Sequence, residues 1–347
     1  MKVEKFTIDL RSDTVTRPTA EMRDVMNSAV TGDDVFAEDP EINELQSRCA
    51  KMFGKEAGLY CPSGTMTNQI AISVHTRPGD EVICDRLSHI YNYEGGGIAR
   101  LSGASVKLLS GDRGRFTSED VLKSINPADS HYAKTSLVSL EDTCNKAGGS
   151  VWDEKEIKAI HQVAKSNAIS MHLDGARLWN AIVARGIQND PEALKKYGSN
   201  FDSISLCLSK GMGCPVGSVL IGTEDFVAKA HRSRKVFGGG MRQAGIIAAA
   251  GIYALDNHLD RLAEDHLHAK MLCEAALENK SVASVAKVET NICILELNPG
   301  IDSAELAKEW GNMGIECFPF SPTSIRFVTH LDVSRTQVEM ACSLVAQ

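Results

Sequence analysis

The segment Ser203-Ile204-Ser205-Leu206-Cys207-Leu208-Ser209-Lys210-Gly211-Met212-Gly213 decides the fold of this chain. Its first six residues form a mainly apolar run that is typical of a strand buried in a sheet. Lys210 follows, and two nearby glycines then turn the backbone sharply away. Because open α/β sheets bind ligands at the carboxyl ends of their strands, we expect Lys210 to lie at a ligand site.

A second strand end carries an acid. An apolar stretch from Ile169 delivers Asp174, and Arg177 follows three residues later. A lysine and an aspartate, each ending its own strand, are what pyridoxal phosphate requires. Lysine forms a Schiff base with this cofactor, and aspartate keeps its pyridine nitrogen protonated, so that the ring can accept electrons. The alternative for each residue alone is a solvated lysine and a turn aspartate.

Alternating strands and helices predict an α/β fold. Helical patterns separate most of the strands, which favours a mostly parallel seven-stranded sheet sandwiched by helices. We assign residues 1–250, with the N-terminal segment, to this large cofactor-binding domain. Residues 251–347 then supply linking helices and a small C-terminal α+β domain. The expected strands are 58–61, 81–84, 105–109, 136–140, 169–173, 203–208 and 218–221.

Composition narrows the classes of partner. A net charge of −8 argues against nucleic acid or an anionic membrane as the main partner. The first ten residues contain no long apolar stretch, so we expect no signal peptide. The ten cysteines lack any Cys-x-x-Cys pair, and most lie in apolar contexts. They are predicted to be reduced core residues of a cytoplasmic protein.

Two motifs near the predicted strand ends could serve the cofactor. Gly64 and Thr65 begin a helix after a strand, where free N–H groups suit a phosphate; the alternative is a plain helix cap. His89 follows the strand that begins at Glu81. There an imidazole could stack on a pyridine ring or move a proton, although a lone histidine is more often structural.

Charged residues further along the chain have competing interpretations. Lys235 and Arg242 flank three glycines, so they could meet a phosphate or form a solvated basic turn. Arg326 lies in an apolar strand, where it needs either a substrate carboxylate or a structural ion pair. His131 lies in a polar loop, and spacing alone does not single it out. No pattern supports a metal site.

Together these residues resemble the low-specificity L-threonine aldolase family, pyridoxal phosphate enzymes of the fold type I (aspartate-aminotransferase-like) group. The resemblance covers nearly the whole chain. It is carried by the segments 9–16, 32–35, 63–68, 88–89, 172–178, 209–211, 239–243 and 326–330. One departure falls in the segment 140–145, where Asp142 and Cys144 stand in place of the Asn and His that relatives often have.

The resemblance implies a role for each matched residue. Lys210 would hold the cofactor, His89 would stack on it, Asp174 would bind its nitrogen, and Gly64 with Thr65 would hold its phosphate. The carboxylate of an amino-acid substrate would be held by Ser12, Arg177 and Arg326, with Arg177 also counted among the cofactor-binding residues. His131 would line the β-hydroxyl side. Lys235 and Arg242 would reach a neighbouring subunit's site, which implies a homo-oligomer, a dimer of dimers with shared active sites.

The implied reaction is retro-aldol cleavage of L-threonine or L-allo-threonine to glycine and acetaldehyde. The alternatives left open are another reaction of the same cofactor, such as β-elimination or transamination, aldol cleavage of phenylserine-type substrates, and a nucleotide-binding module without chemistry. The threo/erythro preference, the general base, the preferred aldehyde and the physiological direction stay open on sequence.

Overall fold

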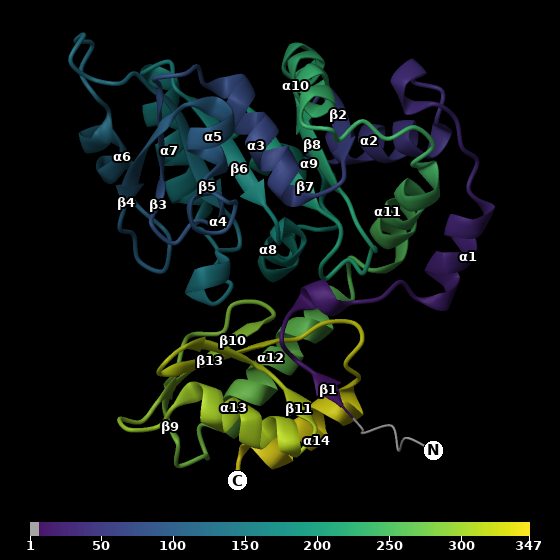
Figure 1. Cartoon of the computed structure of the whole chain (residues 1–347), viewed down its shortest axis with the longest axis vertical. Helices are drawn as coiled ribbons and strands as arrows, with labels where there is room; N and C mark the ends of the chain where they lie inside the picture. Colours follow the sequence, from purple (N-terminus) through teal and green to yellow (C-terminus); the bar gives the residue numbers. More distant parts are fainter. Residues whose placement is uncertain (1–6) are drawn as a thin grey trace.

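The computed structural model describes residues 7–347 and contains two packed parts (Figure 1). Residues 1–6, which belong to the segment where we expect no signal peptide, lie outside the described residues. The larger part holds a seven-stranded sheet of order β2-β8-β7-β6-β5-β3-β4. Its strands are β2 (Ala57–Cys61), β3 (Glu81–Asp85), β4 (Ser105–Leu109), β5 (Thr135–Glu141), β6 (Ser170–Gly175), β7 (Ser203–Cys207) and β8 (Ser218–Gly222). β8 alone runs opposite to the other six strands of this sheet, so the predicted mostly parallel sheet is confirmed.

The sheet is buried on both faces, which explains the apolar strand sequences. Successive side chains of β2 alternate between two cores, Tyr60 facing one and Leu59 with Cys61 facing the other. Helices α3 and α10 cover the second face together. The expectation of a sheet sandwiched by helices is therefore confirmed.

Helices surround both parts of the molecule. No helix within residues 7–347 is long and apolar enough to cross a membrane. The helices of the larger part are α1 (Ala20–Ser28), α2 (Pro40–Met52), α3 (Gly64–His75), α4 (His89–Asn92), α5 (Gly97–Ser102), α6 (Ser118–Ser124), α7 (Glu154–Ser166), α8 (Leu178–Arg185), α9 (Pro191–Gly198), α10 (Glu224–Val236) and α11 (Gly245–Asn257). Helices α12 (Leu262–Ala276), α13 (Ser303–Asn312) and α14 (Arg335–Val345) follow, and short 3-10 turns cover Asp13–Val15, Asp34–Phe36 and Asn145–Ala147.

The smaller part contains an antiparallel sheet of order β12-β13-β10-β9. Its strands are β9 (Val282–Val285), β10 (Ile292–Leu297), β12 (Phe318–Ser321) and β13 (Ser324–Val328). A separate parallel pair joins β1 (Ile8–Asp9) to β11 (Ile315–Glu316). The start of the chain thus lies among the C-terminal elements (Figure 1), whereas the sequence placed it with residues 1–250. Helix α11 packs on α1 and α2, so the larger part continues beyond residue 250.

One pair of cysteines departs from the expectation that all are reduced. Cys273 of α12 and Cys293 of β10 form a disulfide, with Cα atoms 6.0 Å apart. The remaining eight cysteines are free, and seven of them are buried. Helix α12 packs directly on β10, and this tertiary contact brings together two residues that no motif connects.

Candidate active site

Lys210 lies just beyond the carboxyl end of β7, as the sequence predicts. It is half-buried, and its backbone carbonyl accepts a hydrogen bond from Thr16 Oγ1 at 3.1 Å. Its Nζ atom lies 3.7 Å from the sulfur of buried Cys207. Burial alone would raise the pKa of the Cys207 thiol, but the Lys210 ammonium and a hydrogen bond with Ser209 lower it. The amine therefore lies inside the sheet edge and not in bulk solvent.

Asp174 ends the neighbouring strand, β6, at the same edge. Its Oδ1 accepts the Ala176 N–H at 3.1 Å, while its buried Oδ2 has no hydrogen-bond partner within residues 7–347. A buried carboxylate oxygen without a donor is costly, so this atom is free to accept a hydrogen bond from a ligand. The protonated nitrogen of a pyridine ring fits that requirement.

Glu141, at the end of β5, is a carboxyl group that the sequence reading missed. It is buried, and its oxygens accept the backbone N–H groups of His89 at 2.7 Å and Asn145 at 2.9 Å. Burial and the charge of Asp174 raise the pKa of Glu141 to about 7. Glu141 thus joins the two loops that carry His89 and Asn145.

Helix α3 begins at the same edge of the sheet. The Ser63 side chain caps it by accepting the Met66 N–H at 3.2 Å. Gly64 and Thr65 occupy the first helical turn, whose N–H groups favour an anion. A Cβ added to Gly64 would meet Ser218 Oγ at 3.5 Å, which is an ordinary contact, so the side chains around Gly64 do not by themselves require a glycine. The position suits the phosphate of the cofactor.

Arg177 is held by a buried carboxylate. Its Nε and Nη2 donate to the two oxygens of Asp13 at 2.8 and 2.7 Å. Burial alone would raise the pKa of Asp13, but the charge and hydrogen bonds of Arg177 lower it to about 2. Ser12, the residue before this acid, caps the same 3-10 turn. The structure therefore gives Arg177 a structural partner that the sequence reading did not foresee.

Arg326 of β13 is nine-tenths buried and has no carboxylate partner within the described chain. It donates to the Asn145 side-chain oxygen at 3.1 Å and the Arg11 carbonyl at 3.2 Å, and it lies over the rings of Phe318 and Phe320. Burial and the nearby Arg177 charge lower the pKa of Arg326 to about 10. The competing interpretation, a structural ion pair, is not seen in the part of the chain that the structure describes.

Asn145 connects the two arginines. Its side-chain oxygen accepts from Arg177 Nη1 at 3.2 Å as well as from Arg326. Two buried guanidinium groups thus share one neutral acceptor, which leaves positive charge without full compensation. A substrate carboxylate would compensate it bidentately. Asn145 ends the segment 140–145 described above, but nothing in the sequence of that segment marks Asn145 as part of the site.

His89 begins α4, close to these acids. Its Nδ1 lies 3.0 Å from Glu94 Oε1, and its ring centroid lies 5.5 Å from that of Tyr93. Burial alone would lower the pKa of His89, but the Glu94 hydrogen bond and the charges of Asp174 and Glu141 raise it overall. The imidazole is about one-third exposed, at 31% of its side-chain surface, so one side faces the cleft.

Potential metal ligands gather only once in residues 7–347. One atom each from His89, Glu94 and Asp174 lies within 4.8 Å of the other two. We do not assign them to a metal, because Glu94 already accepts three hydrogen bonds from its surroundings. The unpartnered Asp174 oxygen and the partly exposed imidazole instead fit a pyridine ring.

Three candidate residues do not join the cluster within one chain. His131 is exposed in the loop before β5, at the amino edge of the sheet, and its Nδ1 lies 2.7 Å from Asp129. Within a single chain His131 therefore lies at the opposite edge of the sheet from Lys210, and its place on the β-hydroxyl side stays a prediction. Lys235 and Arg242 are also exposed, and Arg242 pairs with Asp33 at 2.7 Å.

The two departures from the family pattern lie behind the site. Asp142 is fully buried and accepts hydrogen bonds from Arg185 and Tyr197, each at 2.8 Å. Cys144 packs closely against Gly114. Both side chains support the loop that carries Asn145, and neither hydrogen-bonds to Lys210 or Asp174.

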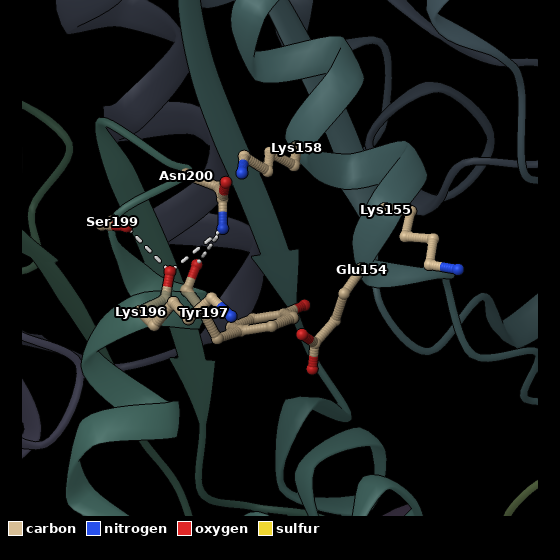
Figure 2. Close-up of a pocket in the computed structure, with 7 residues that line it drawn as sticks. All are labelled: Glu154, Lys155, Lys158, Lys196, Tyr197, Ser199 and Asn200. Atoms are coloured by element: carbon tan, nitrogen blue, oxygen red, sulfur yellow. Dashed lines mark hydrogen bonds between the residues drawn. The ribbon is translucent and has the colours of Figure 1, made fainter.

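A separate pocket of about 370 Å³ lies beside α7 and α9 (Figure 2). None of its lining residues belongs to the Lys210 cluster. They are Glu154, Lys155, Lys158, Lys196, Tyr197, Ser199 and Asn200. Surface lysines of this kind do not define a site, so the chemistry of the molecule is assigned to the cluster around Lys210.

A strand-end lysine, an unpartnered aspartate on the adjacent strand and an anion-binding helix start define a pyridoxal phosphate enzyme of the α/β class. Comparison with known proteins agrees. The sequence profile of the beta-eliminating lyase family matches residues 9–299, and the chain belongs to this family. The cofactor of the family is pyridoxal phosphate.

Individual relatives narrow the comparison. The chain is 41% identical to a low specificity L-threonine aldolase of Escherichia coli strain K12 over 95% of its own length and 96% of that protein. It is 38% identical to low-specificity L-threonine aldolase 1 of Arabidopsis thaliana, covering 98% and 96%. The structure of a Leishmania major threonine aldolase superposes with a TM-score of 0.79 at 19% identity over 97% of this chain and 98% of that one, which shows the shared fold.

The buried Asp13–Arg177 pair predicts an acid-sensitive contribution to stability. Asp13→Asn should lower the free energy of unfolding near neutral pH by about 3–5 kcal/mol, because a buried guanidinium loses its charged partner. The folded-state pKa of about 2 lies below the ordinary value of 3.8. The stabilisation is therefore present above pH 4 and is lost as the pH falls towards 2. Urea midpoints at pH 7 and pH 3 measure it.

Asp9→Asn is the matched control, since Asp9 pairs with Arg11 on the surface. Such a pair contributes about 0–1 kcal/mol, so Asp9→Asn should change the free energy of unfolding little. Equal destabilisation of the two variants, or a gap between wild type and Asp13→Asn that does not narrow in acid, would contradict the assignment.

Proposed function

We propose that this protein is a carbon–carbon lyase that cleaves L-threonine, L-allo-threonine and related L-β-hydroxy amino acids to glycine and an aldehyde. The single observation that carries the substrate class is the pair Arg177 and Arg326, which share Asn145 while Arg326 lacks any carboxylate within residues 7–347. The two arginines lie on the same side of the molecule as Lys210 and Asp174. An α-amino acid can therefore place its carboxylate at the arginines and its amino group at the Lys210 position. The relatives named L-threonine aldolase support the reaction.

The residues present fit pyridoxal phosphate. Asp174 Oδ2 would accept from the ring nitrogen, His89 would stack on the ring, and the start of α3 at Gly64 and Thr65 would bind the phosphate. Lys210 would hold the cofactor covalently. When bound, pyridoxal phosphate links to amino groups and accepts the electron pair of a bond broken at Cα.

The protein's own contribution is orientation and proton handling. Arg326 and Arg177 hold the carboxylate, and the amino group is fixed at the Lys210 position. Two anchored substituents on one carbon determine the direction of its third bond, and such positioning is a large part of catalysis. His89 is the neighbouring group that can take a proton from a hydroxyl on that third substituent.

We also propose a homo-oligomer, a dimer of dimers, in which Lys235 and Arg242 reach the phosphate site of a neighbouring subunit. Both side chains are exposed in one chain. Apolar side chains are exposed around them, including Phe36 at 69% and Val236 at 82%. An apolar surface that surrounds two exposed cations suits burial against a second copy of the chain.

The expected compartment is the cytoplasm. Seven buried free cysteines and a single disulfide in residues 7–347 suit a reducing environment better than a disulfide framework does. The net charge of −8 argues against nucleic acid or an anionic membrane as the main partner.

Wild-type enzyme with L-threonine should release acetaldehyde and glycine in equal amounts, whereas β-elimination would give ammonia and a keto acid. Lys210→Ala should fold and lose activity by about 10³-fold or more, because the amine that exchanges with the substrate is gone. Borohydride reduction of the wild type followed by peptide mapping should place the cofactor on Lys210. A label on another lysine, or ammonia as the product, would refute this reading.

Arg326→Ala should raise KM for L-threonine by roughly 30-fold or more, since a charge-assisted bidentate pair contributes about 2–5 kcal/mol. If the carboxylate also sets the direction of the breaking bond, kcat should fall too. Arg335→Ala is the control, because Arg335 is an exposed arginine of the small part that pairs with Glu339. Steady-state kinetics measures KM and kcat, and cofactor absorbance shows whether the variant still binds the cofactor. Unchanged KM and kcat would mean that Arg326 has only a structural role.

Mixing two variants tests the shared site. Arg242→Ala and Lys210→Ala homo-oligomers should each have low activity. After they are unfolded and refolded together, half of the dimers are hybrids with one complete site, so about a quarter of wild-type activity should return. No recovery, or full activity of Arg242→Ala alone, would show that Arg242 does not act across the interface.

A further inference from the structure

Glu94 is a buried acid that the proposed reaction has not used. Its side chain is 0% exposed and lies between α4 and α5. It accepts three hydrogen bonds, from Asn68 Nδ2 at 2.9 Å, Gln69 Nε2 at 2.5 Å and His89 Nδ1 at 3.0 Å. A carboxylate with this many donors is held in one orientation.

The contact with Glu94 fixes the tautomer of His89. An ionised carboxylate only accepts hydrogen bonds, so Nδ1 of the imidazole carries the proton. The other ring nitrogen, Nε2, takes part in no hydrogen bond within residues 7–347. In the neutral ring this atom has a free lone pair on a side chain that is 31% exposed. The same division of roles makes a carboxylate-oriented histidine a general base in other enzymes.

A chain of hydrogen bonds continues behind Glu94 into the sheet. Asn68 Oδ1 lies 3.1 Å from His172 Nε2. His172 Nδ1 lies 2.9 Å from Ser203 Oγ, which in turn lies 2.8 Å from His75 Nε2. Asn68, His172 and Ser203 are buried, and the chain runs from the carboxyl edge of the sheet towards its amino edge.

Every donor in this chain points towards Glu94. Since Asn68 Nδ2 donates to Glu94, its Oδ1 must accept from His172 Nε2, and His172 Nδ1 then accepts from the Ser203 hydroxyl. Burial lowers the pKa of His172 to about 3 and that of His75 to about 4, so both rings are neutral at pH 7. The amide of Asn68 carries no mobile proton, so the chain orients Glu94 and does not conduct protons.

We propose that Glu94 is the positioning residue that makes His89 the proton acceptor of the reaction. Glu94 holds His89 in the Nδ1-protonated form and raises the basicity of Nε2. As the Cα–Cβ bond breaks, the β-hydroxyl O–H bond breaks too, its proton moves to Nε2, and the C–O bond becomes the aldehyde carbonyl. The electron pair of the broken Cα–Cβ bond is the one that the bound cofactor would accept, whereas the electron pair of the O–H bond forms the carbonyl. This inference rests on the proposed function.

The groups around His89 determine whether its pKa rises or falls when the Glu94 charge is removed. Glu94, Glu141 on β5 and Asp174 on β6 face the imidazole, and each favours the protonated ring. Tyr93 lies against it from the same helical turn. Burial works in the opposite direction. Removing the Glu94 charge therefore lowers the pKa of His89, weakens Nε2 as a base and shifts the acid limb of the rate profile to lower pH.

The first test measures the tautomer and the pKa of His89 in the absence of substrate. In holoenzyme with ¹⁵N-labelled histidine, the His89 signal, assigned by its loss in His89→Asn, should show a protonated Nδ1 and a bare Nε2 above its pKa. In Glu94→Gln the pKa should fall by about 1–2 units. Glu119→Gln, which changes a surface acid paired with Lys123, should leave it unchanged. A resting Nε2–H tautomer in wild type overturns the proposal, even if Glu94→Gln does not fold.

The second test is a double-mutant cycle on aldehyde release. Glu94→Gln should lower kcat by roughly 10- to 1,000-fold, with a smaller change in KM, and its acid limb should move to lower pH. In a His89→Asn background the same change should have no further effect on kcat, because the group that it positions is absent. Additive losses would make Glu94 merely structural. Failure of the proposed function is distinct, since wild type would then release no aldehyde while the His89 titration could still shift.

Discussion

The structure depends on one buried ion pair, Asp13 with Arg177. Asp13 belongs to the segment that starts among the small-domain strands, whereas Arg177 follows β6 of the large sheet. Asp13 also accepts a hydrogen bond at 3.2 Å from Asn291, just before β10. One carboxylate therefore ties three parts of the chain together at the cleft. Because leaving a buried charge without its partner is costly, this contact helps to hold the two domains together, alongside contacts such as the Arg113–Glu289 ion pair.

The cleft that results is lined by acidic side chains on one side and by arginines on the other. On the large-domain side lie the acids Glu94, Glu141 and Asp174, which face the imidazole of His89. Towards the small domain, Arg326 of β13 and Arg177, which follows β6, share one amide oxygen. Groups that are held in place before a ligand arrives need little reorganisation when charge moves, and in a partly buried site their effect is larger than in water. A cationic ring nitrogen and an anionic carboxylate are the complements of these two sides.

Several parts of the site could be predicted and others could not. Lys210 and Asp174 are marked by the strands that precede them, and the edge of a parallel sheet brings strand ends together. Asn145 carried no such mark, because its role arises from Arg326, which is 181 residues away in sequence. Glu94 lies near His89 in sequence, but its orientation depends on Asn68, which is 26 residues away. His131 was placed with the site by resemblance, yet its loop precedes β5 and so lies at the opposite edge within one chain.

By itself the sequence determined the strands, their burial and the chemistry at their ends, since side-chain period and strand-end residues are local properties. The resemblance added the cofactor roles of individual residues. Only the tertiary structure decided which charges are compensated. It gave Arg177 a carboxylate, left Arg326 without one among residues 7–347, joined Cys273 to Cys293 and directed a chain of donors at Glu94. Ion pairs, disulfides and hydrogen-bond direction depend on distances between remote residues, which packing alone fixes.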